Sequence, residues 1–416
     1  MSGKINPYKA FHFPLFRRYL IASSLVRMGT AAQSLAIGWE VYARTDQALS
    51  LGLVGLFQAI PMILIILPAG YLADVYDRRK LMMLSLTGAT LTSFGLAILS
   101  LYQISLKWTY LMLFLDALFI GLGSPAQRAI TPLLIPKEHF ENAVKWSSSL
   151  IHLTGIVGPA IGGIIISFNI EAAYILSAFS SIAFIIFLST MVLPPAPKIK
   201  QGKMIGQIVK SLYYVRKHRL LFGSMSLDLF AVLLGGAVYL LPIFARDIIN
   251  LSSIGIKPET ALGWLRSAPA IGAFIMALTI AHLPTIKNAG KTLFWSVAGF
   301  GLATIIFGIS QNFWLSLLML AITGALDNIS VVIRRVISQM TVPNQMRGRV
   351  QAITAIFVGS SNEIGGFESG LIAHIFNPVF SVVSGGIGTL IIVAAWTGLF
   401  PSLRNLGSLS SLKVKN

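Results

Sequence analysis

The chain has 416 residues, of which 55% are hydrophobic and 11% are charged. A soluble domain carries about 25% charged residues, so this composition excludes an ordinary soluble protein. The formal net charge of +18 would suit a nucleic-acid-binding protein, but the distribution of basic residues described below argues against that class. The sequence contains no cysteine, which excludes disulfides and thiolate metal sites.

Apolar segments long enough to cross a membrane recur along the whole chain. A helix needs about 20 mainly apolar residues for this, and only helices and closed barrels can span hydrocarbon. The alternating pattern of barrel strands is missing from these segments. We therefore predict an all-α membrane protein with twelve transmembrane helices, over residues 20–43, 50–73, 81–104, 108–133, 141–168, 172–193, 221–245, 260–283, 291–310, 313–340, 350–376 and 379–400.

Basic residues concentrate on one side when the connecting loops are assigned alternately to the two membrane faces. That side receives both termini, the loop at 78–80 and a basic linker at 194–219, whereas the other receives Arg44, Lys107, Arg246 and Lys257. The positive-inside rule then places both termini and the linker in the cytoplasm and the chain in the cell (inner) membrane. The same charges attract anionic lipid headgroups. Topology and lipid contact explain the basic charge, and we expect no nucleic-acid partner.

The linker divides the chain into two related halves, residues 1–193 and 220–416, each a predicted six-helix bundle. Four pairs of identical residues lie 207 positions apart: Arg128 and Arg335, Pro136 and Pro343, Gly158 and Gly365, and Gly163 and Gly370. Two repeated halves with a substrate site near the membrane midplane are typical of transporters. The alternative is a membrane protein whose duplication serves packing alone.

The loop after the second predicted span reads Gly70-Tyr71-Leu72-Ala73-Asp74-Val75-Tyr76-Asp77-Arg78-Arg79-Lys80. A glycine permits close approach of helices, and a carboxylate at a membrane edge can bond helix amides or a guanidinium. This loop closely resembles the signature of the major facilitator superfamily. Its ending is similar to the branch that contains macrolide efflux pumps and the enterobactin exporter. The resemblance implies a cytoplasmic gate formed by Gly70, Asp74, Asp77, Arg78 and Arg79. In the alternative interpretation the basic residues only anchor the topology.

A glycine-rich run in the fifth predicted span, Gly155-Ile156-Val157-Gly158-Pro159-Ala160-Ile161-Gly162-Gly163, is similar to a motif of exporters in that superfamily. Its glycines would make a smooth face for helix contact, and its proline permits a kink. Residues 124–143 and 343–370 extend the resemblance. One feature departs from it. Many proton-driven drug exporters carry an arginine before a glycine in span four, and this sequence has none near Gly121 and Gly123.

Several ionisable residues lie inside predicted spans, where each costs about 2.5–3.5 kcal/mol near the helix centre and needs a reason. Arg27 and Asp228 lie about 10 Å from the cytoplasmic edge at 1.5 Å per residue, so we expect a structural or gating pair, with substrate binding in the cavity as the alternative. Glu40 should be solvated near the outer edge. Among the arginines near the cytoplasmic mouth we expect gate or snorkelling residues: Arg128, Arg334 and Arg335.

Asp327 and Glu363 lie close to the expected midplane, and a buried carboxylate there can load and release a proton. We favour Glu363 as the carrier because Arg334 shares the helical face of Asp327. Asp116 and Asp228 are the next candidates. The alternative is a structural hydrogen bond, for example to Asn328 or Asn362. Further residues are expected to line the cavity: Gln33, Gln58, Tyr239 and Asn362.

We therefore expect a secondary active transporter that works by alternating access, most consistent with proton-coupled export of a small amphipathic or chelating molecule. It would act as a monomer with a small-molecule substrate, protons or another coupling cation, and membrane lipids as partners, without cofactor or metal. An enzyme is disfavoured, because no nucleophile constellation, phosphate loop or metal cluster occurs in the sequence. The alternatives are an importer or uniporter of a nutrient or metal ion, and a non-transporting membrane receptor.

Overall fold

The computed structural model describes residues 8–191, 212–283, 286–343 and 346–409, and in these ranges the chain is helical without strands. The helices of the first half are α1 (Pro14–Thr45), α2 (Ala48–Val75), α3 (Arg78–Leu101), α4 (Leu106–Ile130), α5 (Phe140–Ile166) and α6 (Glu171–Thr190). Those of the second are α8 (Arg219–Leu234), α9 (Leu241–Ile243), α10 (Pro258–His282), α11 (Ala289–Ile309), α12 (Phe313–Thr341), α13 (Arg347–Ile375), α14 (Pro378–Leu399) and α15 (Pro401–Arg404).

The prediction of an all-helical membrane protein is confirmed, and every predicted span except the seventh coincides with one helix to within about six residues. Among the described residues, 11 helical segments are long and apolar enough to cross a membrane. The predicted span at 350–376 is α13, which is not among the 11. This helix carries Glu363 and Glu368 in its interior. These carboxylates lower the mean hydropathy of α13 and help to explain why it is not among the 11 apolar segments.

The seventh predicted span is not continuous. Helix α8 ends at Leu234, and the chain goes on as the short 3-10 helix η4 (Gly236–Leu240), α9 and the π-helical turn η5 (Phe244–Ile248). A Cβ atom at Gly236 would lie 2.5 Å from the carbonyl oxygen of Gly365 in α13, so only glycine permits this approach. Irregular backbone at membrane depth is tolerated where it lines a cavity or is covered by protein. The break positions Tyr239 beside α13.

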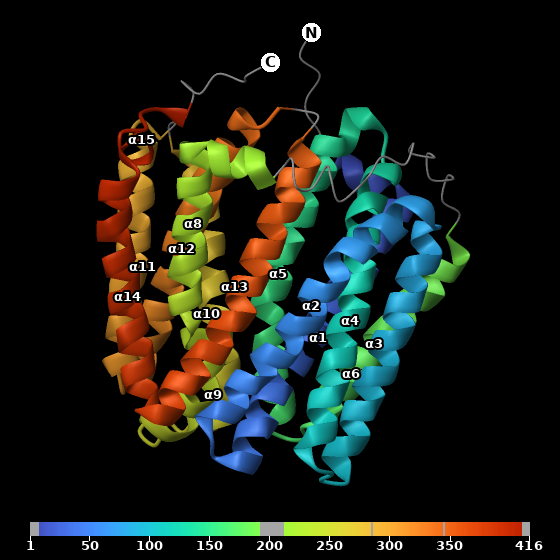
Figure 1. The fold of residues 1–416 in the computed structure, drawn as a ribbon. Coiled ribbons are helices and arrows are strands. Elements are labelled where there is room, and N and C mark those ends of the chain that lie inside the picture. The colour runs from blue at the N-terminus through green and yellow to red at the C-terminus, as the bar shows by residue number, and fades with distance from the viewer. Residues whose placement is uncertain (1–7, 192–211, 284–285, 344–345, 410–416) are drawn as a thin grey trace. The chain divides into compact units, whose positions relative to one another are not determined.

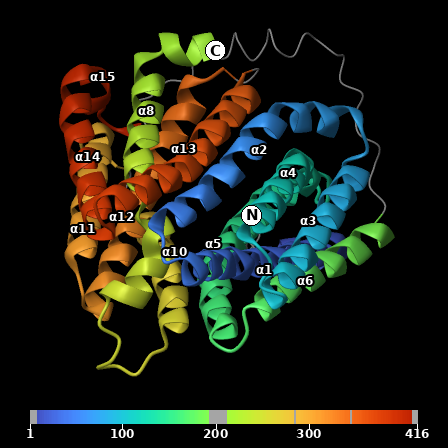
Figure 2. The ribbon, with the colours of Figure 1, turned by 60° about the horizontal axis from the view of Figure 1, so that its bottom comes forward.

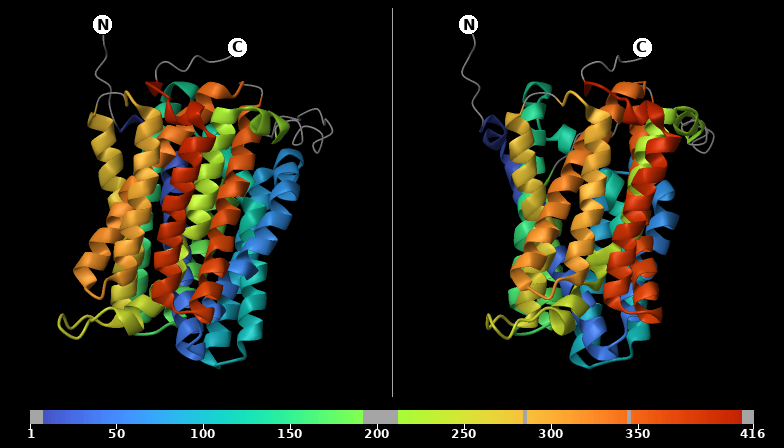
Figure 3. Two further views of the ribbon diagram at one scale, coloured as in Figure 1. Left: turned by 60° about the vertical axis from the view of Figure 1, so that its left-hand side comes forward. Right: turned by 90° about the vertical axis from the view of Figure 1, so that its left-hand side faces the viewer.

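By packing, the chain divides into two units. Unit 1 comprises Met1–Arg44, Phe57–Ile199 and Leu262–Ser267, and unit 2 comprises Thr45–Leu56, Lys200–Ala261 and Ala268–Asn416. In unit 1, α3 packs against both α4 and α6 (Figure 1). In unit 2, α11 packs against α12 and α14, and α8 packs against α13 (Figure 3). The expected halves, 1–193 and 220–416, remain a prediction, and most of the expected linker at 194–219 lies outside the described residues.

Glycines of α5 face α1 in unit 1, where the two helices lie side by side (Figure 2). A Cβ atom at Gly158 would lie 2.8 Å from Ala31 Cβ, and one at Gly162 would lie 2.9 Å from Ala32 Cα. Gly163 in turn faces Gly263 of α10, whose added Cβ would lie 2.8 Å from Gly163 Cα. Lipid tails are as apolar as leucine, so close van der Waals contact between small residues is what stabilises helix pairs in a membrane.

We expect Gly162→Ala to lower the melting temperature of the purified protein, because the new methyl group meets the backbone of α1. Overpacking of this kind costs about 1–3 kcal/mol. The matched control is Gly398→Ala in α14, where an added Cβ meets nothing within 4 Å. Thermal unfolding in detergent, followed by tryptophan fluorescence, compares the two variants. Equal melting temperatures would contradict this close contact.

Candidate functional site

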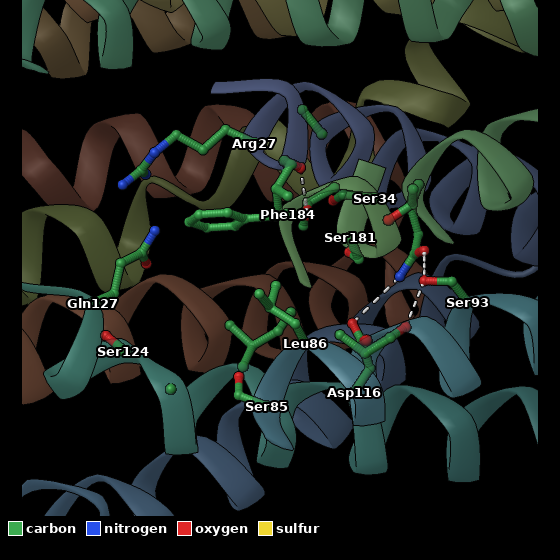
Figure 4. A pocket seen from close by; sticks show the side chains of 18 of the residues that line it. Arg27, Ser34, Ser85, Leu86, Ser93, Asp116, Ser124, Gln127, Ser181 and Phe184 are labelled. Atoms are coloured by element: carbon green, nitrogen blue, oxygen red, sulfur yellow. Dashed lines mark hydrogen bonds between the residues drawn. The ribbon is translucent and has the colours of Figure 1, made fainter. Parts of the chain in front are cut away.

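Unit 1 contains a cavity of about 450 Å³ between α1, α3, α4, α5 and α6 (Figure 4). Charged side chains among its described lining residues are Arg27 and Asp116. Hydroxyl groups make up much of the remaining polar lining, from Thr30, Ser34, Ser85, Ser93, Ser124, Thr154, Ser177 and Ser181. These hydroxyl groups stand among apolar side chains and can hydrogen-bond the polar groups of a small molecule.

Asp116 is held at one end of this cavity by neutral hydrogen-bond donors. Its side chain accepts hydrogen bonds from Thr92 Oγ1 at 2.7 Å and from Gln33 Nε2 at 3.3 Å. Ser93 Oγ donates to Gln33 Oε1 at 2.7 Å, which fixes the amide. Only 6% of Asp116 is exposed, and within the described ranges it forms no ion pair. A buried carboxylate without a counter-charge is a group that can take up a proton.

Arg27 lies at the other end of the cavity, near Gln127, Ser124 and Phe184 (Figure 4). Its side chain is exposed, and the described part of the chain offers it no hydrogen bond or ion pair. The pair with Asp228 that the sequence suggested stays a prediction, because the two residues belong to different units. Within unit 2, Asp228 is bonded to Arg334.

Unit 2 contains a cavity of about 630 Å³ lined by α8, α12 and α13. Arg334 forms an ion pair with Asp228, and its Nη2 lies 3.6 Å from Asp327 Oδ1. The side chains of Arg334 and Asp228 are 12% and 7% exposed, whereas that of Asp327 is 48% exposed. The ion pairs disfavour snorkelling as the role of Arg334, because its guanidinium lies between two carboxylates, and the expected gate role stays a prediction. The shared helical face of Asp327 and Arg334 is confirmed.

Glu363 accepts a hydrogen bond from the hydroxyl of Tyr239, which the break in the seventh span brings to α13. A Cβ atom at Gly55 of α2 would lie 2.7 Å from the carbonyl oxygen of Glu363. Tyr239, Asp327 and Asn362 also line a smaller cavity of about 200 Å³. Asn328 Oδ1 is buried without a hydrogen-bond partner in the described ranges.

Residues 70–80 comprise the end of α2, a short turn and the start of α3. Side chains of this segment also contact the end of α6. Asp77 caps α3 by accepting from the backbone N–H groups of Arg79 at 2.8 Å and Lys80 at 3.3 Å. The Arg79 guanidinium donates to the carbonyl oxygens of Met191, at 2.6 Å, and Ser189. Such bonds satisfy the free carbonyls at a helix end.

The other predicted gate residues lie apart from this network. Arg78 Nε donates to Ala73 O at 3.3 Å, and Gly70 lies within α2. Asp74 is exposed, with no hydrogen bond or ion pair to any described residue. Arg128 is also exposed and donates to Ser124 Oγ at 3.2 Å. The exposed Arg335 lines the unit 2 cavity. Gln58, which the sequence predicted to line a cavity, is half-buried on α2.

The expectation that Glu40 is solvated is wrong. It is 4% exposed, accepts a hydrogen bond from Tyr174 Oη at 2.7 Å, and forms an ion pair with Arg44 at 3.1 Å. Arg44 Nη2 also donates to Ile104 O at 2.5 Å, so the cluster joins α1, α6 and the loop after α3. The spacing of Glu40 and Arg44 at i and i+4 was a signal for the ion pair. Tyr174 was not predictable, since it lies 134 residues away.

Comparisons with known proteins give a consistent family and fold. The profile of the family described as transmembrane secretion effector matches residues 5–413. The Enterobactin exporter EntS of Escherichia coli O1:K1 / APEC is 26% identical over 382 residues, which cover 91% of this chain and 90% of that protein.

Solved structures with the major facilitator fold are similar along almost the whole chain. The nucleoside transporter NupG matches with a TM-score of 0.74 at 15% identity, covering 93% of this chain and 99% of that one. A D-xylose-proton symporter matches with a TM-score of 0.69 at 12% identity, covering 95% and 100%. At these identities the likeness shows the fold alone, and it is the predicted major facilitator fold.

We expect Arg334→Gln to destabilise the protein by about 3–5 kcal/mol, because it leaves Asp228 buried without a counter-charge. The double variant Arg334→Gln/Asp228→Asn should recover much of this loss. Arg335→Gln removes an exposed charge from the next position of α12 and serves as the control. Melting temperatures in detergent provide the comparison. If Arg334→Gln melts like Arg335→Gln, the pair contributes nothing to stability.

Proposed function

Because this chain belongs to the transmembrane secretion effector family and is a secondary transporter of the major facilitator fold, we propose that it couples proton entry to export of a small amphipathic or chelating molecule. It would work by alternating access, as a monomer in the cell (inner) membrane, with both termini in the cytoplasm. The observation that carries the proposal is the placement of the membrane-embedded charges. Arg27, Asp116, Asp327 and Arg334 line cavities in their units.

Export of an amphipathic or chelating molecule has two supports. A relative that matches over 91% of this chain is named for the export of enterobactin. The unit 1 cavity combines hydroxyl groups with the apolar side chains of Val26, Met82, Leu86 and Ile120. Sites of about 300–1,000 Å³ with mainly apolar walls and a few polar groups suit small organic ligands.

Proton coupling would use a carboxylate whose charge is not already compensated. Asp228 and Asp327 both lie beside Arg334, which stabilises their ionised forms. Asp116, by contrast, accepts hydrogen bonds from the neutral groups of Thr92 and Gln33 and forms no ion pair with a described residue. We therefore place Asp116 beside Glu363, the carrier favoured for its expected midplane position, and Asp327 behind them. This ranking puts Asp116 ahead of Asp327, whereas the sequence suggested Glu363 and Asp327 first and Asp116 after them.

The alternatives are an importer or uniporter of a nutrient or metal ion, and a non-transporting receptor. The described residues include no group of three or more histidine, cysteine, aspartate or glutamate side chains that could hold a metal ion. A resident metal or cofactor is not part of the proposal. The direction and the coupling of transport separate these alternatives experimentally.

Reconstituted protein should move a candidate substrate, such as enterobactin, against its gradient when a pH gradient is imposed. Asp116→Asn and Glu363→Gln mimic the protonated side chains, so the variant of the true carrier should still exchange substrate but lose gradient-driven transport. The control is Glu141→Gln, since the Glu141 side chain is 82% exposed and pairs with Lys145 at the surface. If both variants keep full gradient-driven transport, the proton site lies elsewhere or the protein is a uniporter.

The proposed topology can be tested with single cysteines, because the chain has none of its own. We expect a membrane-impermeant maleimide to label Gln103→Cys, in the loop after α3, in intact cells. Tyr213→Cys, whose side chain is 66% exposed, should react only after the membrane is permeabilised. The reverse pattern would invert the orientation.

A further inference from the structure

The unit 1 cavity has a cation at one end and a hydrogen-bonded carboxyl group at the other. Arg27 and Gln33 both lie on α1, and Gln33 is bonded to Asp116. Six residues of helix separate the two positions, which is about 9 Å along the axis. Figure 4 shows Arg27 beside Gln127 and Ser124, and Asp116 beside Ser93 at the opposite end. The cavity therefore has a guanidinium group at one end and a carboxyl group at the other.

Arg27 is one of the two charged side chains that line this cavity. Within the described residues of unit 1 it makes no hydrogen bond or ion pair, although its side chain is exposed to the cavity. The acidic group of the same cavity, Asp116, is bonded to Thr92 and Gln33. An arginine inside a membrane span is costly, so one without a partner indicates a functional site.

Anchoring at the membrane surface does not explain Arg27. It lies thirteen residues inside α1, which begins at Pro14. That position is about 20 Å along the helix from its first residue and about 10 Å inside the predicted span 20–43, whereas snorkelling side chains lie near helix ends. Arg17 and Arg18, close to the start of α1, are placed to anchor the helix in that way.

We propose that Arg27 binds the acidic group of an amphipathic organic acid, which is the transported molecule of the function proposed above. A guanidinium presents planar N–H donors that match a carboxylate bidentately. Ser124 and Gln127 lie beside Arg27 and can donate further hydrogen bonds (Figure 4). The ring of Phe184 and the side chains of Leu86 and Ile120 line the cavity and offer contact to an apolar body. The Asp116 end then accepts a hydrogen bond from a hydroxyl or amine group of the same molecule.

The test uses two probes of the same shape and different charge, 2-naphthoate and 2-naphthamide. Binding to the purified full-length protein in detergent is measured by calorimetry. Naphthoate should bind about 10- to 100-fold more tightly than naphthamide, as expected for a charge-assisted hydrogen bond. Arg27→Gln should remove this preference by weakening naphthoate alone. Arg18→Gln removes the same charge from the same helix outside the cavity and should leave both affinities unchanged.

A second variant keeps the test decisive if Arg27→Gln does not fold. Arg27→Lys retains the charge but loses the bidentate geometry, so naphthoate affinity should fall by several-fold while naphthamide is unaffected. Equal affinities for the two probes, no binding of either, or a preference that survives at Arg27→Gln would overturn the proposal.

Failure of the proposed function gives a different result. Acid binding through Arg27 without any transport in proteoliposomes would refute export and leave the binding site intact. Transport without a preference for the acid would refute the site and leave export intact.

Discussion

A charged side chain inside a membrane-spanning helix is costly unless another group compensates its charge or it faces a cavity. Unit 2 meets this requirement with Arg334, which is shared by Asp228 and Asp327. In unit 1, Glu40 near the C-terminal end of α1 forms an ion pair with Arg44 and accepts a hydrogen bond from Tyr174, near the N-terminal end of α6. Helix positions in each unit therefore follow from the need to bring these groups together.

Small residues make those pairings possible. Gly158 and Gly162 let α5 contact α1, which is one wall of the unit 1 cavity. Gly236 lets the broken seventh span approach α13, where Tyr239 reaches Glu363. Without side chains to separate the backbones, polar groups on neighbouring helices come within hydrogen-bond distance. At Gly236, for example, the same glycine permits close helix contact and brings the Tyr239 hydroxyl within hydrogen-bond distance of Glu363.

The groups left without charge compensation are the ones that a transporter needs. Asp116 is held by neutral donors and can exchange a proton. Arg27 faces the unit 1 cavity without a partner among the described residues and can accept an anion. Binding of protons and of substrate at such groups lowers the cost of burying them. This gives a physical basis for coupling the two, through Gln33, which lies on α1 with Arg27 and donates a hydrogen bond to Asp116 of α4.

The sequence by itself determined the helical membrane fold, the approximate bounds of its spans and the family, since these depend on apolar segments of about 20 residues and on motifs in single loops. Only the tertiary structure decided the partners of the charged residues. Asp228 is bonded to Arg334, and Glu40 is buried against Tyr174, 134 residues away. Hydropathy does not encode how each helix is rotated about its axis, and the break at Gly235 and Gly236 depends on contact with α13. Partners distant in the chain therefore become visible only when the helices are packed.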